Sequence, residues 1–155
     1  MELDDIMYAA ITGDSSLVNL TDGNIVTCCF EVPPDIEDNT PLPYIIIIED
    51  PTQNEQGTKD DVWDSDYDSA QVTIEIAAAT KAEVKQLRRK VRKAIREYVS
   101  TMDYTTRPDL KSFRNEGIAW DWLKPCYYDR LHYQCDVLFT DEDDEQENEN
   151  QSGES

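Results

Sequence analysis

The amino-acid sequence predicts an α+β protein with a single domain, in which a mostly antiparallel sheet of about four strands packs against one long and one short helix. Three observations lead to this fold class. The helical and extended patterns follow one another in the order helix, two or more strands, helix, two strands. A chain of 155 residues has room for one domain. Its hydrophobic content of 39% is sufficient for a folded core.

Two segments have the apolar spacing of amphipathic helices. Residues 3–11 place apolar side chains three and four positions apart, and Gly13 is expected to end this short helix. The long helix is expected to begin at Thr80, because Thr80 and Glu83 fit a capping box, and to end near Met102. Its apolar face is predicted to consist of Val84, Leu87, Val91, Ile95 and Tyr98.

Five segments are predicted to be strands. Residues 24–32 and 43–49 are rich in β-branched side chains, and the four consecutive isoleucines of the second segment predict a central strand that is covered on both faces. Residues 70–77 alternate between apolar and polar side chains, which predicts a half-buried strand. Residues 118–123 and 131–140 are the last two candidates, and they carry much of the later aromatic bulk.

The charge of the chain is strongly negative and unevenly distributed. It holds 34 acidic and 14 basic residues, which gives a formal net charge of -20 at pH 7. This balance argues against a protein whose main task is to grip phosphate backbones. Residues 141–155 contain acidic and polar side chains without a base or an apolar aliphatic or aromatic residue, so we expect a disordered acidic tail after a domain at residues 1–140. Residues 52–68 are expected to form a long solvated loop.

The sequence contains little that suggests catalysis or a cofactor. His132 is the only histidine, and it lies in a predicted strand without a nucleophile motif, so we interpret it as a structural or surface residue. The four cysteines lack zinc-ligand spacing and are interpreted as buried small side chains. No apolar run approaches the length of a membrane span, and the first residues are acidic where a signal peptide is basic. We therefore expect a soluble protein, made in the cytoplasm, that is no enzyme and holds no cofactor.

The acidic loop offers one alternative, a site for a divalent cation. Glu75 is the twelfth residue counted from Asp64, which is the ligand spacing of a calcium-binding helix–loop–helix motif. However, Ser69 stands where that motif needs glycine, and a strand rather than a helix follows. We favour a solvated loop and no metal site, although its aspartates could attract magnesium weakly. The candidate interaction residues of this loop are Asp60, Asp61, Asp64, Asp66 and Asp68.

Two further groups are candidates for contacts with partners. The polar face of the long helix is basic, and we favour a solvated face, or one that meets an acidic neighbouring subunit, over a nucleic-acid site. Its candidate interaction residues are Arg88, Arg89, Arg92, Lys93 and Arg96. Trp120 and Trp122 are two positions apart and would share one face of a strand. They indicate either a packed core layer or a contact surface, and both interpretations remain open.

Several short motifs accompany these elements in order. After the short helix comes Pro-Leu-Pro-Tyr at 41–44, which leads into the aliphatic strand. A Gly-Thr-Lys-Asp loop at 57–60, the alternating strand at 72–76 and the helix at 81–100 come next, the helix with Val-Arg-Lys-Ala-Ile at 91–95. This order of elements and motifs resembles that of the tail terminator (tail completion, or minor tail) proteins of tailed bacteriophages. The likeness covers about residues 3–100, and the closing strand at 131–140 is in keeping with it.

This resemblance implies a structural virion protein that forms a ring, commonly a hexamer, at the neck between head and tail. Such a ring sits on the last ring of tail-tube protein, stops tube growth and meets the head-side connector, while DNA passes through without specific binding. It implies no catalytic residues and no membrane. Two other classes are the alternatives, an acidic DNA-mimic inhibitor and an assembly adaptor or chaperone that would act through its acidic tail.

Overall fold

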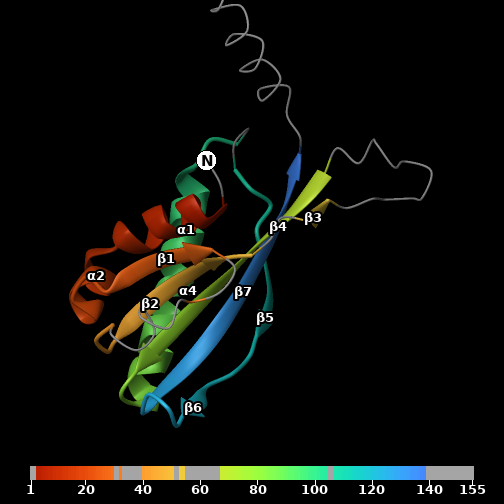
Figure 1. The fold of residues 1–155 in the computed structure, drawn as a ribbon. Coiled ribbons are helices and arrows are strands. Elements are labelled where there is room, and N and C mark those ends of the chain that lie inside the picture. Colours follow the sequence, from red (N-terminus) through yellow and green to blue (C-terminus); the bar gives the residue numbers. More distant parts are fainter. Residues whose placement is uncertain are drawn as a thin grey trace, which may run out of the picture.

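The structure, a computed structural model, describes residues 3–29, 32, 40–50, 53–54, 67–104 and 107–138. Within these residues the chain forms helices and a single sheet, which confirms the predicted α+β class (Figure 1). The helices are α1 (Leu3–Thr12), α2 (Ser15–Thr21) and α4 (Lys81–Thr101). The strands are β1 (Ile25–Cys29), β2 (Tyr44–Glu49), β3 (Gln53–Asn54), β4 (Tyr67–Ala78), β5 (Lys111–Asn115), β6 (Ala119–Asp121) and β7 (Cys126–Leu138).

The sheet is built around the long antiparallel pair of β4 and β7. The strand order is β1-β2-β4-β7-β5, with β3 beside β4 and β6 beside β7. The pairing of β4 with β7 runs from Tyr67 and Leu138 at one end to Ala78 and Tyr127 at the other. All pairs are antiparallel except that of β1 with β2, so the expectation of a mostly antiparallel sheet is confirmed.

The helices cover one face of this sheet and enclose the main core (Figure 1). The helix α4 begins as predicted, because the side-chain oxygen of Thr80 accepts a hydrogen bond from the Glu83 amide at 3.2 Å. Its apolar face and that of α1 pack on β2, β4 and β7. The largest fully buried side chains of this core are Met7, Ile11, Leu17, Ile45, Ile47, Ile74, Ile76, Leu87, Ile95 and Leu131.

The opposite face of the sheet carries a second, smaller apolar cluster. Its buried members are Tyr44, Ile46, Ile48, Ala77 and Cys126, and partly buried side chains that include Val32 and Leu42 pack against them. The isoleucines of β2 therefore contact apolar neighbours on both faces. This confirms that the strand is central and covered on each side.

The structure adds a helix and a sheet-edge strand to the elements expected from the sequence, besides the short strand β3. The helix α2 follows Gly13 directly, since Asp14 caps it by accepting a hydrogen bond from the Leu17 amide at 3.1 Å. The strand β5 forms the edge of the sheet beside β7, where the sequence indicated only a connection. None of the helices among the described residues is long and apolar enough to cross a membrane.

The two acidic segments lie mainly outside the described residues. The tail at 141–155 lies wholly outside them, and so does most of the predicted loop at 52–68. The ends of that loop are strand, because Gln53 and Asn54 of β3 pair with Ser69 and Asp68 of β4.

Candidate functional site

Three apolar side chains are exposed together at the turn between β6 and β7: Trp120, Trp122 and Leu123. We call them the aromatic tip. Trp122 is 85% exposed, Leu123 98% and Trp120 36%. The Trp120 ring contacts Trp122 and Tyr127 edge-on, with ring centroids 5.9 Å and 4.7 Å apart. Of the two interpretations of the tryptophan pair, this exposure favours a contact surface over a core layer.

The turn that carries the aromatic tip is fixed by hydrogen bonds to one side chain. Asp121, the last residue of β6, accepts through Oδ1 from the backbone amides of Leu123 at 2.9 Å and Lys124 at 3.4 Å. This is the local pattern by which aspartate reverses a chain. The prediction of one strand over residues 118–123 is therefore wrong at its end, because Trp122 lies in the turn beyond β6.

A hollow of about 300 Å³ lies beside the aromatic tip, and residues of the smaller apolar cluster form part of its wall. Lys124 holds one side of it in place. Its Nζ donates to the carbonyl oxygen of Thr40 at 2.6 Å and lies 4.7 Å from the centre of the Tyr44 ring. The lining residues are Tyr44, Glu75, Trp120, Asp121, Trp122, Leu123, Cys126, Tyr128 and Arg130.

An ion pair in the wall of this hollow joins the neighbouring strands β4 and β7. Glu75 of β4 is only 3% exposed, and its Oε1 accepts from Nε of Arg130 in β7 at 3.0 Å. The Tyr44 hydroxyl donates to Oε2 at 3.4 Å, and the Arg130 guanidinium lies 5.6 Å from the centre of the Tyr128 ring. Burial disfavours the charged guanidinium, but the Glu75 charge and hydrogen bond outweigh burial, so the pKa of Arg130 is raised.

The expected half-buried character of β4 is wrong, because its polar face is covered too. Thr73 is 6% exposed, and its hydroxyl donates to Oδ2 of Asp50 at 3.0 Å. Oγ1 of Thr73 also lies 3.0 Å from Nδ1 of His132 on β7, and Nε2 of His132 lies 2.9 Å from Oε2 of Glu116. His132 thus links β4 to the segment before β6, in agreement with its interpretation as a structural residue.

Arg88 belongs to the core of the fold rather than to an exposed basic face. Its Nη1 donates to Oδ2 of Asp129 at 2.8 Å, and the Asp129 side chain is fully buried. The other carboxylate oxygen of Asp129 accepts from the amides of Gly117 at 3.0 Å and Arg130 at 2.8 Å. One carboxylate therefore connects α4, β7 and the loop before β6.

The remaining candidates of the basic helix are exposed, as expected. Arg89, Arg92, Lys93 and Arg96 all lie on the solvent side of α4. Lys93 is 3.9 Å from Glu97 one turn later, and both side chains are more than half exposed. Such a pair contributes little to stability. These four residues are therefore available to a partner, whereas Arg88 is not.

The acidic candidates are only partly placed by the structure. Asp68 lies in β4, opposite Val137 of β7, and the structure does not describe Asp60, Asp61, Asp64 and Asp66. Among the residues that it does describe, no three histidine, cysteine, aspartate or glutamate side chains are grouped as metal ligands would be.

Several residues of the site were not identified from the sequence. Leu123 completes the aromatic tip, and the signal for its turn was present in Asp121 and Pro125, which are common turn residues. Glu75, Arg130 and Asp129 gave no comparable local signal. Their partners lie 41 to 55 positions away in the chain.

No protein-family model and no curated protein matches this sequence. The fold is similar to that of a chain in a solved structure described as "Virion of native gene transfer agent (GTA) particle". The two chains share 15% sequence identity with a TM-score of 0.48, and the match covers 88% of this chain and 95% of that chain.

Proposed function

We propose that this protein is a structural subunit of a tailed-bacteriophage virion, a tail terminator that assembles into a ring at the neck between head and tail. The observation that carries the proposal is the aromatic tip, which presents two tryptophans and a leucine to solvent on a fixed turn. We propose a ring as the form of assembly because residues 3–100 resemble the ring-forming tail terminator family.

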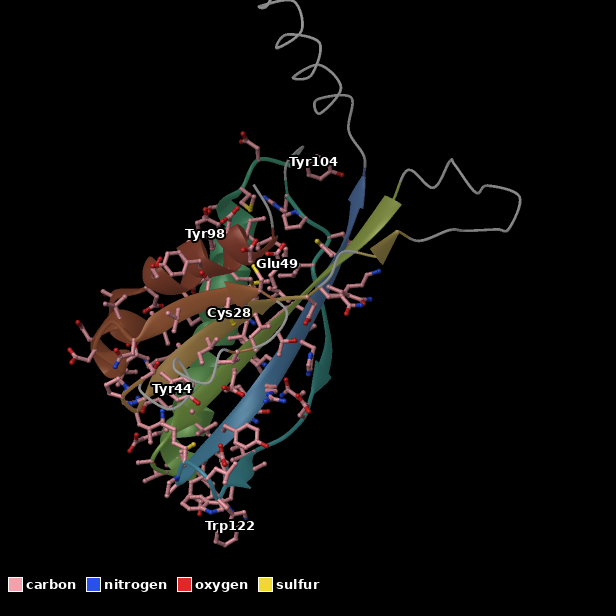
Figure 2. The ribbon with its side chains drawn as sticks, viewed as in Figure 1. Cys28, Tyr44, Glu49, Tyr98, Tyr104 and Trp122 are labelled. Carbon is pink, nitrogen blue, oxygen red and sulfur yellow. The ribbon has the colours of Figure 1, made fainter. Side chains whose placement is uncertain are left out.

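The aromatic tip has the properties of a contact between subunits. Tryptophan contributes disproportionately to binding energy when it enters a pocket of a partner. The turn is already fixed by Asp121 and Lys124, so little conformational entropy is lost when the tip is buried. Figure 2 places Trp122 at the extreme end of the molecule, where a neighbouring subunit can reach it.

The charge of the protein suits a ring through which DNA moves. A net charge of -20 on each chain repels phosphate, so a channel lined by acidic segments lets DNA slide without sticking. In this proposal the segment at 52–68 faces the channel or the adjacent ring. The exposed basic side chains of α4 meet an acidic neighbour, and the outer partners are the tail-tube protein and the head-side connector.

The test is the mass of the purified protein in light scattering, across protein concentration and with or without magnesium. We expect a species of about six chains, each of 17.8 kDa, in keeping with a closed ring. Replacing Trp122 and Leu123 with serine removes the exposed apolar surface and should shift the protein toward the monomer. The matched control is Tyr104→Ser, since Tyr104 is 91% exposed but lies at the other end of the molecule (Figure 2).

A monomer under every condition would contradict self-assembly and favour the DNA-mimic inhibitor. An equal loss of mass in the Tyr104 variant would show that assembly does not depend on the aromatic tip. An assembly adaptor that acts through the acidic tail would lose its activity when the charges of residues 141–155 are removed. Ring formation should survive that change.

A further inference from the structure

We propose that the acidic tail at residues 141–155 binds the exposed basic stripe of α4 in the same chain and shields that stripe from nucleic acid. The basic stripe consists of Lys85, Arg89, Arg92 and Arg96, which lie at intervals of three and four positions along the solvent side of the helix. The contact lies within one chain, so it can form before assembly, and the acidic neighbour in the proposed ring would displace the tail from the stripe.

The basic stripe has no acidic partner in the described part of the molecule. The ion pairs found there involve Arg88, Lys93, Lys111, Arg130 and His132, and none of them uses a side chain of the stripe. Four cations in a row along a helix repel one another at separations shorter than the screening length of about 8–10 Å. The stripe is therefore a positive surface to which a carboxylate-rich segment is electrostatically complementary.

The direction of β7 relative to α4 supports this contact. The helix α4 and the strand β7 run side by side in the same direction, since Lys81 lies 5.6 Å from the centre of the Tyr127 ring at their beginnings. Further along, the charges of Arg92 and Arg96 act on Tyr133, partly offsetting the burial that raises the pKa of its hydroxyl. The strand β7 ends at Leu138, and this end of the strand and the C-terminal end of α4 lie toward the same end of the molecule (Figure 1).

The length and charge of the tail match the stripe. From Lys85 to Arg96 the helix rises about 16 Å. Fifteen extended residues reach about 50 Å, so the tail can turn back and follow the whole stripe. The eight carboxylates of the tail exceed the four charges that they must meet. Because both partners belong to one chain, the effective concentration of the tail at the stripe is in the millimolar range.

Shielding is the functional consequence that we infer. A basic stripe exposed beside DNA would attract phosphate oxygens and slow the passage of DNA, whereas a carboxylate-covered stripe would not. The same contact can be displaced by a more acidic surface of a partner protein, because exposed ion pairs of this kind exchange readily.

Zero-length carbodiimide coupling of the full chain, read by mass spectrometry, tests the contact. We expect tail carboxylates to couple to Lys85 and Lys93 about fivefold more than to Lys111, and to lose this preference at about 0.5 M NaCl. Lys111 is the matched control, because its side chain is 61% exposed against 64% for Lys93, and it lies on β5 opposite Gln134, in the last part of β7. Equal coupling to Lys111, or none to α4, would overturn the proposal.

Isotope mixing separates the chain's own tail from that of a second copy. In a mixture of unlabelled and nitrogen-15-labelled chains, coupling within a chain gives pairs of one isotope only. Mixed pairs would overturn the assignment to the same chain and point to an adjacent subunit.

Charge variants of the full chain test the shielding. The changes Arg89→Glu, Arg92→Glu and Arg96→Glu lie on a solvent-exposed face of α4. They should reduce the coupling of tail carboxylates to Lys85 to the level seen for Lys111. A chain with its eight tail acids changed to amides should bind a labelled DNA duplex about tenfold more tightly than the natural chain at low salt, and the arginine changes should reverse that gain. Unchanged DNA binding by the amide variant would contradict shielding.

Discussion

Removing the positive charge of Arg88 should destabilise the fold far more than removing that of its neighbour Arg89. The change that isolates the charge is Arg88→Met, because methionine keeps an unbranched stem at this position of α4. It leaves the Asp129 carboxylate in the interior, where its side chain has no exposure to solvent. Among the described residues, the backbone amides of Gly117 and Arg130 then remain as its hydrogen-bond donors.

The magnitude follows from the geometry of the pair. Breaking a buried ion pair by removing one partner costs roughly 3–5 kcal/mol. The Arg88 side chain is 25% exposed and two amide donors remain, so the cost should lie at the lower end, at about 3 kcal/mol. Arg89→Met removes an exposed charge on the same helix and should change stability by less than about 0.5 kcal/mol.

Urea unfolding of the two variants measures both effects, and a third variant identifies the cause. Asp129→Asn neutralises the carboxylate while keeping one oxygen for the two amides. In the double variant with Arg88→Met the buried charge is gone, so the combined loss should be smaller than the sum of the single losses by about 1–2 kcal/mol. A cost below about 1 kcal/mol for Arg88→Met, or strictly additive losses, would refute the reasoning.

Three further predictions concern the core, a thiol and a partly buried acid. Ile74→Ala should lower the free energy of unfolding by about 3–4 kcal/mol in urea, because Ile74 is completely buried. Burial raises the pKa of the Cys28 thiol to about 11, so its alkylation should be slow at pH 8 and accelerate about tenfold per pH unit up to pH 10. The pKa of Asp4 is raised mainly by burial and further by the charges of Glu49 and Asp5. Asp4→Asn should therefore increase the free energy of unfolding at pH 7.

A specific result would contradict each of these predictions. For Ile74 it is a loss no larger than that of Thr27→Ala, an exposed position in β1. For Cys28 it is a rate that reaches its plateau below pH 9. The gain from Asp4→Asn should shrink as pH falls and Asp4 becomes protonated, since a raised folded-state pKa penalises the fold only while the group is charged. A gain that persists unchanged at pH 4 would contradict the electrostatic origin.

The elements that local patterns specify were predicted well. Thr80 and the apolar spacing after it define α4 from its first turn to Thr101, because both signals lie within the helix itself. The isoleucines of β2 predicted a central strand covered on both sides, and they contact apolar clusters on each face. The short helix α2 was missed because its seven residues offer too few turns for a periodic pattern.

The candidate site depended on contacts that no local pattern records. The alternating pattern of β4 predicted that Glu75 faces solvent. In the structure, Arg130 and Tyr44 from other strands cover it. Arg88 has the same sequence context as the exposed arginines around it. Only the position of Asp129, 41 residues later, makes it part of the core. Tertiary pairing of this kind overrides what spacing along one element indicates.

The pairing of β4 with β7 also determines how the chain must fold. Its cross-strand contacts join residues far apart in the sequence, such as Thr73 with His132, 59 positions apart, and Glu75 with Arg130, 55 positions apart. Closing loops of this length before any contact is gained is slow, so we expect slower folding than that of a helical bundle of similar size. The long helix α4 lies between the two strands in sequence, and its early formation shortens the segment that must close. We expect α4 and its docking on β4 to be formed in the transition state, with β7 arriving last to complete the sheet.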